Sequence, residues 1–228
     1  MNRIILFCSF LLLSYFTYSQ ELSQVTFASG VNLTSFAFMT DQDVLIRVSN
    51  DGKIMEWGIE VQSLRSNNYY APRLQPFMGR IDYYGPEADS INRGKVRSIG
   101  TCSITYYGTY ETVEKIGKLK SIGIISLDYY SNYDNAILKG KIRFAGNLML
   151  EYYSSFDDEG FRGKLKSIGS TAITYYSSFD DKLIRGKIKS IGGTSYQWYT
   201  SIDRIGYGGG LKTGSFRQSI GGVTYILQ

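Results

Sequence analysis

Residues 163–185 read GKLKSIGSTAITYYSSFDDKLIR, and this stretch of 23 residues returns along the chain without a change of spacing. The glycines that open the copies are Gly94, Gly117, Gly140, Gly163, Gly186 and Gly209. Self-similarity at a fixed period of 20–50 residues is typical of repeat architectures, in which each repeat is one supersecondary unit. The repeat therefore outweighs every local motif in predicting the fold class.

One repeat reads as a β-hairpin. Residues 164–166 alternate charged and apolar side chains, and residues 173–176 are β-branched or aromatic, which suits strands. Residues 180–182, Asp-Asp-Lys, have the composition of a polar turn. Gly163 is expected where the chain turns with a positive φ, and the second glycine of the repeat, Gly169, at a bulge or tight connection.

Neighbouring hairpins are predicted to pair strand to strand. Each hairpin then advances the sheet by about 10 Å, because strands lie about 4.8 Å apart. One face receives the aliphatic residues Val96, Leu119, Ile142, Leu165, Ile188 and Leu211. Ile173 and Tyr175 share one face, and Thr174 and Tyr176 the other, so both faces carry tyrosine. The predicted fold is all-β: an elongated antiparallel sheet of tandem 23-residue β-hairpin repeats.

The chain divides into four segments. Residues 1–19 have the basic start, short apolar core and small-residue exit of a secretory signal peptide, and the apolar run is too short for a full membrane span. Residues 20–78 are predicted as a β region with an irregular loop, residues 79–213 as the repeat array, and residues 214–228 as a capping hairpin. Cys8 lies too early for a lipidation site, so we expect a periplasmic or secreted protein.

Charge and cysteine content exclude several classes. The chain has 25 Lys and Arg against 20 Asp and Glu, a mild excess that favours solubility more than an anionic partner such as nucleic acid. Cys102 is the lone cysteine after signal cleavage, so no intramolecular disulfide is expected. It reads as a small apolar space-filler.

Catalytic motifs are missing from the sequence. It contains no histidine, which removes Ser-His-Asp and Cys-His catalysis and His-based metal sites. Acids recur once per repeat at Glu111, Asp134, Asp157, Asp180 and Asp203, and we interpret them as solvated turn residues. A carboxylate hydrolase and a calcium site at residues 157–159 are the alternatives. We expect no enzyme activity and no cofactor or metal.

Paired aromatic residues are the best candidates for binding a partner, because tyrosine offers a large amphipathic area. The candidates are Tyr106, Tyr107, Tyr129, Tyr130, Tyr152, Tyr153, Tyr175, Tyr176, Trp198 and Tyr199. The alternative is that they are cross-strand packing. The lysine and arginine rows of the first strand, such as Lys164 and Lys166, read as a solubilising face or as a basic stripe.

The repeats resemble the MORN family and its bacterial relatives, over roughly residues 78–213. The likeness lies in the period, in Gly-Lys-Leu-Lys at residues 163–166 and in the Tyr-Tyr pairs, although Ser-Ile-Gly replaces the family's usual Tyr/Trp-x-Gly. A looser similarity, through Phe156-Asp157 and Phe179-Asp180, is to the Tyr-Asp repeats of bacterial shell-forming surface proteins. The resemblance implies an elongated, non-catalytic β-sheet that mediates contacts.

The leading hypothesis is a non-catalytic exported repeat protein that acts as a protein-interaction scaffold. An accessory or plug-like subunit of an outer-membrane secretion or transport assembly would need export, solubility and a rigid contact surface. The second hypothesis is a carbohydrate- or cell-surface-binding module that uses tyrosine ladders. We expect a protein partner, with a glycan as the alternative, no nucleic acid and no direct membrane span.

Overall fold

The computed structural model describes residues 21–61, 73–203 and 206–228. This part of the chain is all-β, which confirms the predicted fold class. The predicted signal peptide and residues 62–72 of the irregular loop lie outside the described residues. Within them, no helix has the length and apolar character needed to cross a membrane.

Eleven strands form the sheet of the repeat array, in the order β16-β15-β14-β13-β12-β11-β10-β9-β8-β7-β6. Their bounds are β6 Ile81–Tyr83, β7 Val96–Ile99, β8 Cys102–Tyr106, β9 Leu119–Ile122, β10 Ile125–Tyr129, β11 Ile142–Ala145, β12 Leu148–Tyr152, β13 Leu165–Ile168, β14 Thr171–Tyr175, β15 Ile188–Ile191 and β16 Thr194–Ser195. Strands adjacent in sequence are adjacent in the sheet and antiparallel, as predicted.

Each repeat contains one tight turn and one long loop. β13 and β14 pair Ile168 with Thr171 across a tight turn, where Gly169 has a φ of +53°. β14 then pairs with β15 of the next repeat, Tyr175 opposite Ile188, after a long loop. The loop re-enters the sheet at Gly186, whose φ of +68° strongly favours glycine. Both predicted glycine positions therefore occur where the chain needs them.

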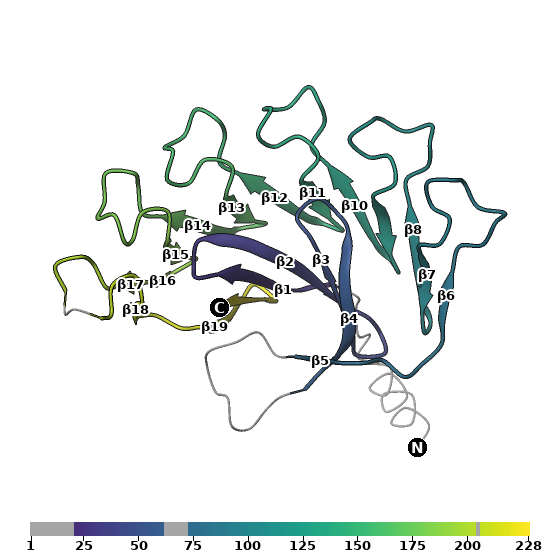
Figure 1. The fold of residues 1–228 in the computed structure, drawn as a ribbon, viewed down its shortest axis with the longest axis horizontal. Coiled ribbons are helices and arrows are strands. Elements are labelled where there is room, and N and C mark those ends of the chain that lie inside the picture. The colour runs from purple at the N-terminus through teal and green to yellow at the C-terminus, as the bar shows by residue number, and fades with distance from the viewer. Residues whose placement is uncertain (1–20, 62–72, 204–205) are drawn as a thin grey trace, which may run out of the picture.

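The repeat sheet is curved like an open fan. Figure 1 shows the tight turns gathered at the inner end of the hairpins and the long loops splayed along an outer arc. The fan continues into the pair β17 Gln197–Trp198 and β18 Leu211–Thr213, which follows the same hairpin pattern. The 23-residue period predicts the strand order, but it leaves the curvature open.

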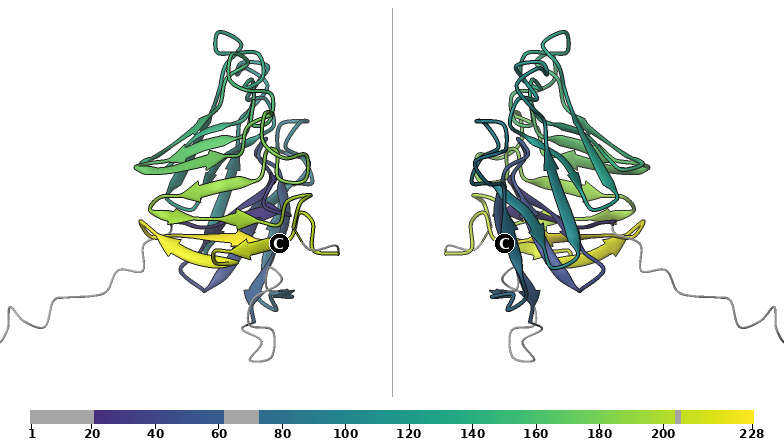
Figure 2. Two further views of the ribbon diagram at one scale, coloured as in Figure 1. Left: turned by 90° about the vertical axis from the view of Figure 1, so that its left-hand side faces the viewer. Right: turned by 90° about the vertical axis from the view of Figure 1, so that its right-hand side faces the viewer.

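A second sheet of seven strands lies within the curve of the fan, in the order β19-β20-β1-β2-β3-β4-β5 (Figures 1 and 2). Its strands are β1 Glu21–Ala28, β2 Asn32–Met39, β3 Val44–Val48, β4 Ile54–Glu60, β5 Leu74–Gln75, β19 Arg217–Ile220 and β20 Val223–Leu227. The C-terminal hairpin β19–β20 belongs to this sheet, because β20 pairs in parallel with β1, Gln24 opposite Thr224.

The core lies between the two sheets. Phe27, Phe36 and Ile46 of the seven-stranded sheet share one buried cluster with the aliphatic row predicted on one face of the repeats. Five members of that row, Val96, Leu119, Ile142, Leu165 and Ile188, are 0–7% exposed. Burying a side chain of this size stabilises the fold by about 1.5–3 kcal/mol. The same residue in successive repeats thus builds one continuous apolar layer.

Two hairpin turns of the inner sheet lock the fan in place. The turn between β3 and β4 accepts hydrogen bonds from the repeat strands, from Leu119 N to Gly52 O at 3.3 Å and from Ile142 N to Asn50 O at 3.0 Å. The turn between β1 and β2 does the same, from Ile188 N to Gly30 O at 2.8 Å. These bonds satisfy strand groups that would otherwise lie unpaired in the interior.

Candidate interaction surface

The first aromatic residue of each pair faces the core. These first-column aromatics are Tyr106, Tyr129, Tyr152, Tyr175 and Trp198, and the last four are at most 6% exposed. Their polar atoms bond inside the chain: Tyr129 Oη to Leu119 O at 2.7 Å, Tyr175 Oη to Leu165 O at 2.9 Å, and Trp198 Nε1 to Ile188 O at 2.7 Å. Burial raises the pKa of Tyr129 and Tyr175 well above its usual value.

The second aromatic residue of each pair ties one repeat to the next. These second-column tyrosines are Tyr84, Tyr107, Tyr130, Tyr153, Tyr176 and Tyr199. In the first five, the hydroxyl donates to a main-chain carbonyl 20 residues later, as from Tyr130 Oη to Leu150 O at 2.9 Å. Rings of the two columns meet edge to face, at 6.1 Å between the centroids of Tyr107 and Tyr129. This geometry is favourable for aromatic pairs.

The candidate tyrosines are therefore placed in the framework of the array. A repeated tyrosine pattern looks the same in the sequence whether the tyrosines bind a partner or pack within the sheet. The inner sheet, which covers the first-column aromatics, comes from segments far away in the sequence. Partner binding by these ten residues stays a prediction, with only the partly exposed Tyr106, Tyr153, Tyr176 and Tyr199 offering appreciable surface.

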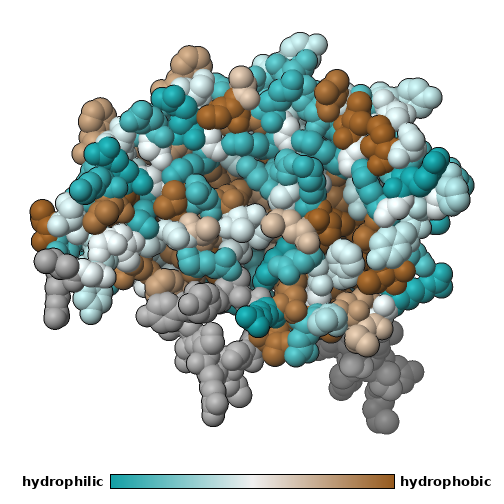
Figure 3. Space-filling model, in the orientation of Figure 1, coloured by the Kyte–Doolittle hydropathy of each residue, from teal (hydrophilic) through white to brown (hydrophobic). Residues whose placement is uncertain are grey.

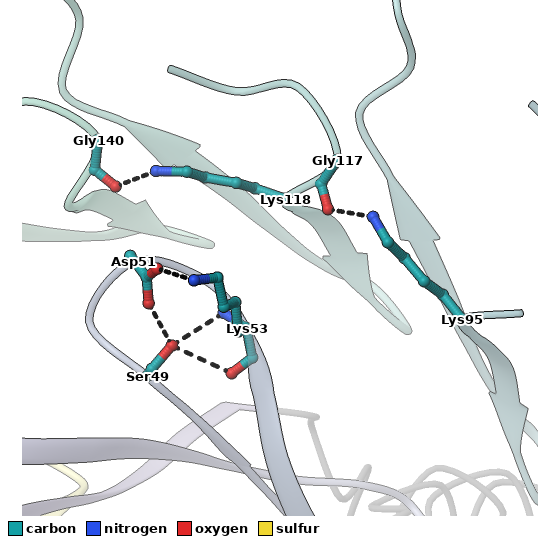
Figure 4. A network of polar contacts seen from close by, with 7 residues as sticks. All are labelled: Ser49, Asp51, Lys53, Lys95, Gly117, Lys118 and Gly140. Carbon is teal, nitrogen blue, oxygen red and sulfur yellow. Dashed lines mark hydrogen bonds and ion pairs between the residues drawn. The ribbon is translucent and has the colours of Figure 1, made fainter. Parts of the chain in front are cut away.

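Lysine side chains form an internal row beside the first column. These inner lysines are Lys95, Lys118, Lys141, Lys164 and Lys187, and each Nζ lies 4.4–5.3 Å from the centroid of a first-column ring. Nζ of Lys95 also donates to Gly117 O at 2.5 Å, and Lys118 donates to Gly140 O (Figure 4). Partial burial lowers the pKa of these lysines, to about 8 for Lys164, where Lys187 adds repulsion.

The other basic row lies on the outward face of the fan. These outer cations are Arg97, Lys120, Arg143, Lys166 and Lys189, and each lies over a second-column ring at 5.4–6.0 Å. All except Arg143 are exposed. The inner lysines therefore pack inside the fan. The exposed outer cations are the row to which the two alternatives, a solubilising face and a basic stripe, still apply.

The repeated acids fix the loops. In four of them, one carboxylate oxygen accepts from the main-chain N–H and the hydroxyl of a Ser or Thr three residues earlier, as Asp157 does from Ser154 at 2.6 and 2.8 Å. The other three pairs are Asp134 with Ser131, Asp180 with Ser177 and Asp203 with Thr200. The hydrogen bonds lower the pKa of Asp157. These acids act as turn caps, which agrees with their interpretation as turn residues.

A second acid in two loops links each loop to the next. Asp158 accepts from Ser178 N at 2.8 Å and from Ser178 Oγ at 2.7 Å. Asp181 accepts in the same way from Ser201. The hydrogen bonds to serine lower the pKa of both carboxyls, so they are ionised at neutral pH. Adjacent loops are therefore braced against each other along the outer arc.

One apolar side chain stands at the tip of each braced loop. These rim residues are Tyr110, Tyr133, Phe156, Phe179 and Ile202, spaced by 23 residues and 93–103% exposed. Figure 3 shows apolar side chains at several points of the outer arc, in places separated by hydrophilic side chains. The rim residues were not among the binding candidates predicted from the sequence, although their signal was present: a large apolar residue directly precedes the recurring acid in all five copies.

The described residues offer no metal-binding cluster of three or more Cys, Asp or Glu side chains. Of residues 157–159, Asp157 caps its own loop and Asp158 braces the next one. Cys102 is buried, and burial raises the pKa of its thiol to about 11. A thiol with this pKa stays protonated, which agrees with a space-filling role.

Comparison of the chain with family models, with curated proteins and with solved structures found no match. The resemblance to the MORN family is neither supported nor opposed by these comparisons. The geometry of the array is therefore the basis for a functional argument.

Proposed function

We propose that this chain is a non-catalytic exported protein whose repeat array is a protein-interaction scaffold, with the outer arc of loops as its contact surface. The observation that carries the proposal is the row of rim residues, five large apolar side chains that are at least 93% exposed. Single exposed apolar side chains are normal on protein surfaces, so it is their recurrence at one position of successive repeats that supports the proposal. Because the five rim residues recur every 23 residues along one arc, we treat them as one surface.

The loops support this proposal because they present the rim residues in a fixed arrangement. Four of the five tips are followed by a capping acid, as Phe156 is by Asp157, and bonds such as Ser178 to Asp158 join one loop to its neighbour. A surface that is ordered before binding loses less conformational entropy when a partner docks. Fully burying one such side chain contributes about 1.5–3 kcal/mol before the costs of association.

An accessory or plug-like subunit of an outer-membrane secretion or transport assembly is the setting that we propose for this scaffold. Such a subunit needs export, a rigid body and a contact surface. The predicted signal peptide, the interlocked sheets and the rim supply these three features.

The test replaces all five rim residues with serine in the tagged full-length protein. Wild type should retain a stoichiometric protein partner from detergent-solubilised envelope, and the rim variant should lose at least nine tenths of it. The matched control replaces Arg97, Lys120, Lys166 and Lys189 of the outward face with serine, and it should keep the partner. The proposal fails if wild type retains no stoichiometric protein, or if the rim variant retains as much as wild type.

A carbohydrate- or cell-surface-binding module is the second candidate, favoured by the exposed aromatic rings of the rim, on which sugar rings can stack. In this case a glycan array should detect binding that disappears in the rim variant. The sequence predicts that the paired tyrosines would bind the glycan, but most of their hydroxyls donate hydrogen bonds within the sheet.

A further inference from the structure

We infer that the rim binds a basic protein surface, in which apolar pockets that receive the rim residues are surrounded by lysine or arginine side chains. This inference rests on the proposed function and specifies the chemistry of the partner. Four observations carry it: the charge of the loops, the fixed ionisation of their acids, the separate projection of the rim residues, and the internal use of the neighbouring polar groups.

The loops are acidic although the chain is basic. The described residues of the five loops, which are 108–116, 131–139, 154–162, 177–185, 200–203 and 206–208, contain nine acidic and five basic residues, an excess of four negative charges. The whole chain carries a formal charge of +5. The loops around the rim residues therefore carry a net negative charge although they also contain lysine and arginine, and the rest of the chain carries a net positive charge. Complementary potentials at an interface steer the encounter and select the partner.

The negative charge of the rim is permanent at neutral pH. Capping hydrogen bonds lower the pKa of Asp134 and Asp157, and Lys212 with Thr200 lowers that of Asp203 to about 2. Two further acids, Glu111 and Glu159, are exposed and take no part in the hydrogen bonds that cap or brace the loops. These two carboxylates are available to a partner without disturbing a loop.

The separate projection of the rim residues argues against a membrane as the partner. Figure 1 shows the loop tips standing apart along an outward-curving arc, so a flat surface meets few of them at once. Anionic lipid surfaces attract basic segments, and the rim has the opposite charge. A protein surface with separate pockets can receive each tip, and apolar anchors that fill pockets dominate many interfaces.

A sugar chain is also disfavoured, because sugar recognition needs free hydrogen-bonding groups beside the aromatic ring. Next to Phe156, Ser154 is bonded to Asp157, and next to Phe179, Ser178 is bonded to Asp158. The polar groups nearest to these rings are thus already used to hold the loops. What the rim offers, besides the hydroxyls of Tyr110 and Tyr133, is apolar area and a net negative charge, and these complement a basic, pocketed protein surface.

The experiment uses the photo-crosslinking amino acid p-benzoylphenylalanine at position 179 of the full-length protein, in the envelope of the cells that make it. Position 103 on the outward face serves as the control site. Crosslinked peptides are identified by mass spectrometry after reaction at about 0.1 M and about 1 M salt, where the Debye length falls from about 10 to about 3 Å. The same reaction is run with Glu111→Lys and Glu159→Lys together, and with Glu21→Lys as the matched control, since Glu21 is exposed on β1.

The inference is supported if position 179 crosslinks to peptides rich in Lys or Arg beside apolar residues. High salt and the double charge reversal should each reduce the yield at least threefold, and Glu21→Lys should leave it unchanged. Crosslinks to peptides poor in Lys and Arg, to lipid or to glycan, or a yield that ignores both changes, overturn the inference. A protein adduct of any kind leaves the proposed function standing, whereas no protein adduct at either site removes both. Circular dichroism of each variant confirms that it is folded.

Discussion

Phe156 and Phe161 lie in the same loop, yet truncating them to alanine should change the free energy of unfolding by very different amounts. Phe156 is a rim residue and 93% exposed, so folding removes less than a tenth of its surface from water. Full burial of such a side chain is worth about 1.5–3 kcal/mol, and the part buried here about 0.2 kcal/mol. Phe161 is half-buried and packs on Tyr153 with ring centroids 4.6 Å apart, and on Tyr175 at 6.4 Å.

Replacing Phe161 with alanine should therefore cost about 2 kcal/mol, roughly half of the 3–5 kcal/mol found for fully buried phenylalanine. Phe156→Ala should change the free energy of unfolding by less than about 0.5 kcal/mol, as surface substitutions usually do. Urea unfolding followed by circular dichroism measures both values, provided that the slope m is the same in the two variants and in wild type. A loss above about 1 kcal/mol in Phe156→Ala would show that the rim serves the fold, and the argument for a contact surface would then be wrong.

Three further outcomes follow from the framework of the array. Gly52→Ala should cost more than Gly94→Ala in urea unfolding: both residues have positive φ, which costs about 1–2 kcal/mol for alanine, but only at Gly52 would the added Cβ overlap Tyr129. Tyr130→Phe should cost about 1 kcal/mol in the same assay, since it removes a 2.9 Å hydrogen bond to a main-chain carbonyl. The urea midpoint should rise with pH from about 8 towards 10. Burial lowers the pKa of Lys164 to about 8, so in this range the unfolded chain binds more protons than the folded one. Lys164→Met should flatten this rise, and a wild-type midpoint that does not rise would contradict the prediction.

The period made the fold predictable, because one hairpin repeated six times leaves few ways to pair its strands. The alternation in residues 164–166 and the β-branched run at 173–176 became β13 and β14, and the aliphatic row, including Leu165, became the core. The curvature of the fan was not predictable in this way. It depends on the inner sheet, whose turns at Gly30 and Gly52 bond to the repeats from positions far away in sequence.

The candidate site was less predictable than the fold, for a related reason. Tyr129 and Tyr133 are the same residue type four positions apart, yet one is 2% and the other 95% exposed. The period shows that a residue type returns at fixed positions. Whether such a position is buried depends on the inner sheet that covers part of the array. Lys118 and Lys120 are likewise only two positions apart and differ in environment. Lys118, directly before β9, lies beside Tyr129 inside the fan, and Lys120 in β9 lies on the outward face.

The copies of the repeat within this chain separate positions that the fold requires from positions that it does not. The position three residues after each rim residue is exposed in the first four loops, and it is occupied by Val113, Ala136, Glu159 and Lys182. Because the fold places no restriction on that position, apolar, acidic and basic residues all occur there. The rim position is at least as exposed, yet it is Tyr, Tyr, Phe, Phe and Ile in five of the six copies. The remaining copy, in the loop between β6 and β7, has the exposed Glu87. Burial does not account for the apolar residue in those five copies, whereas the proposed contact with a partner would account for it.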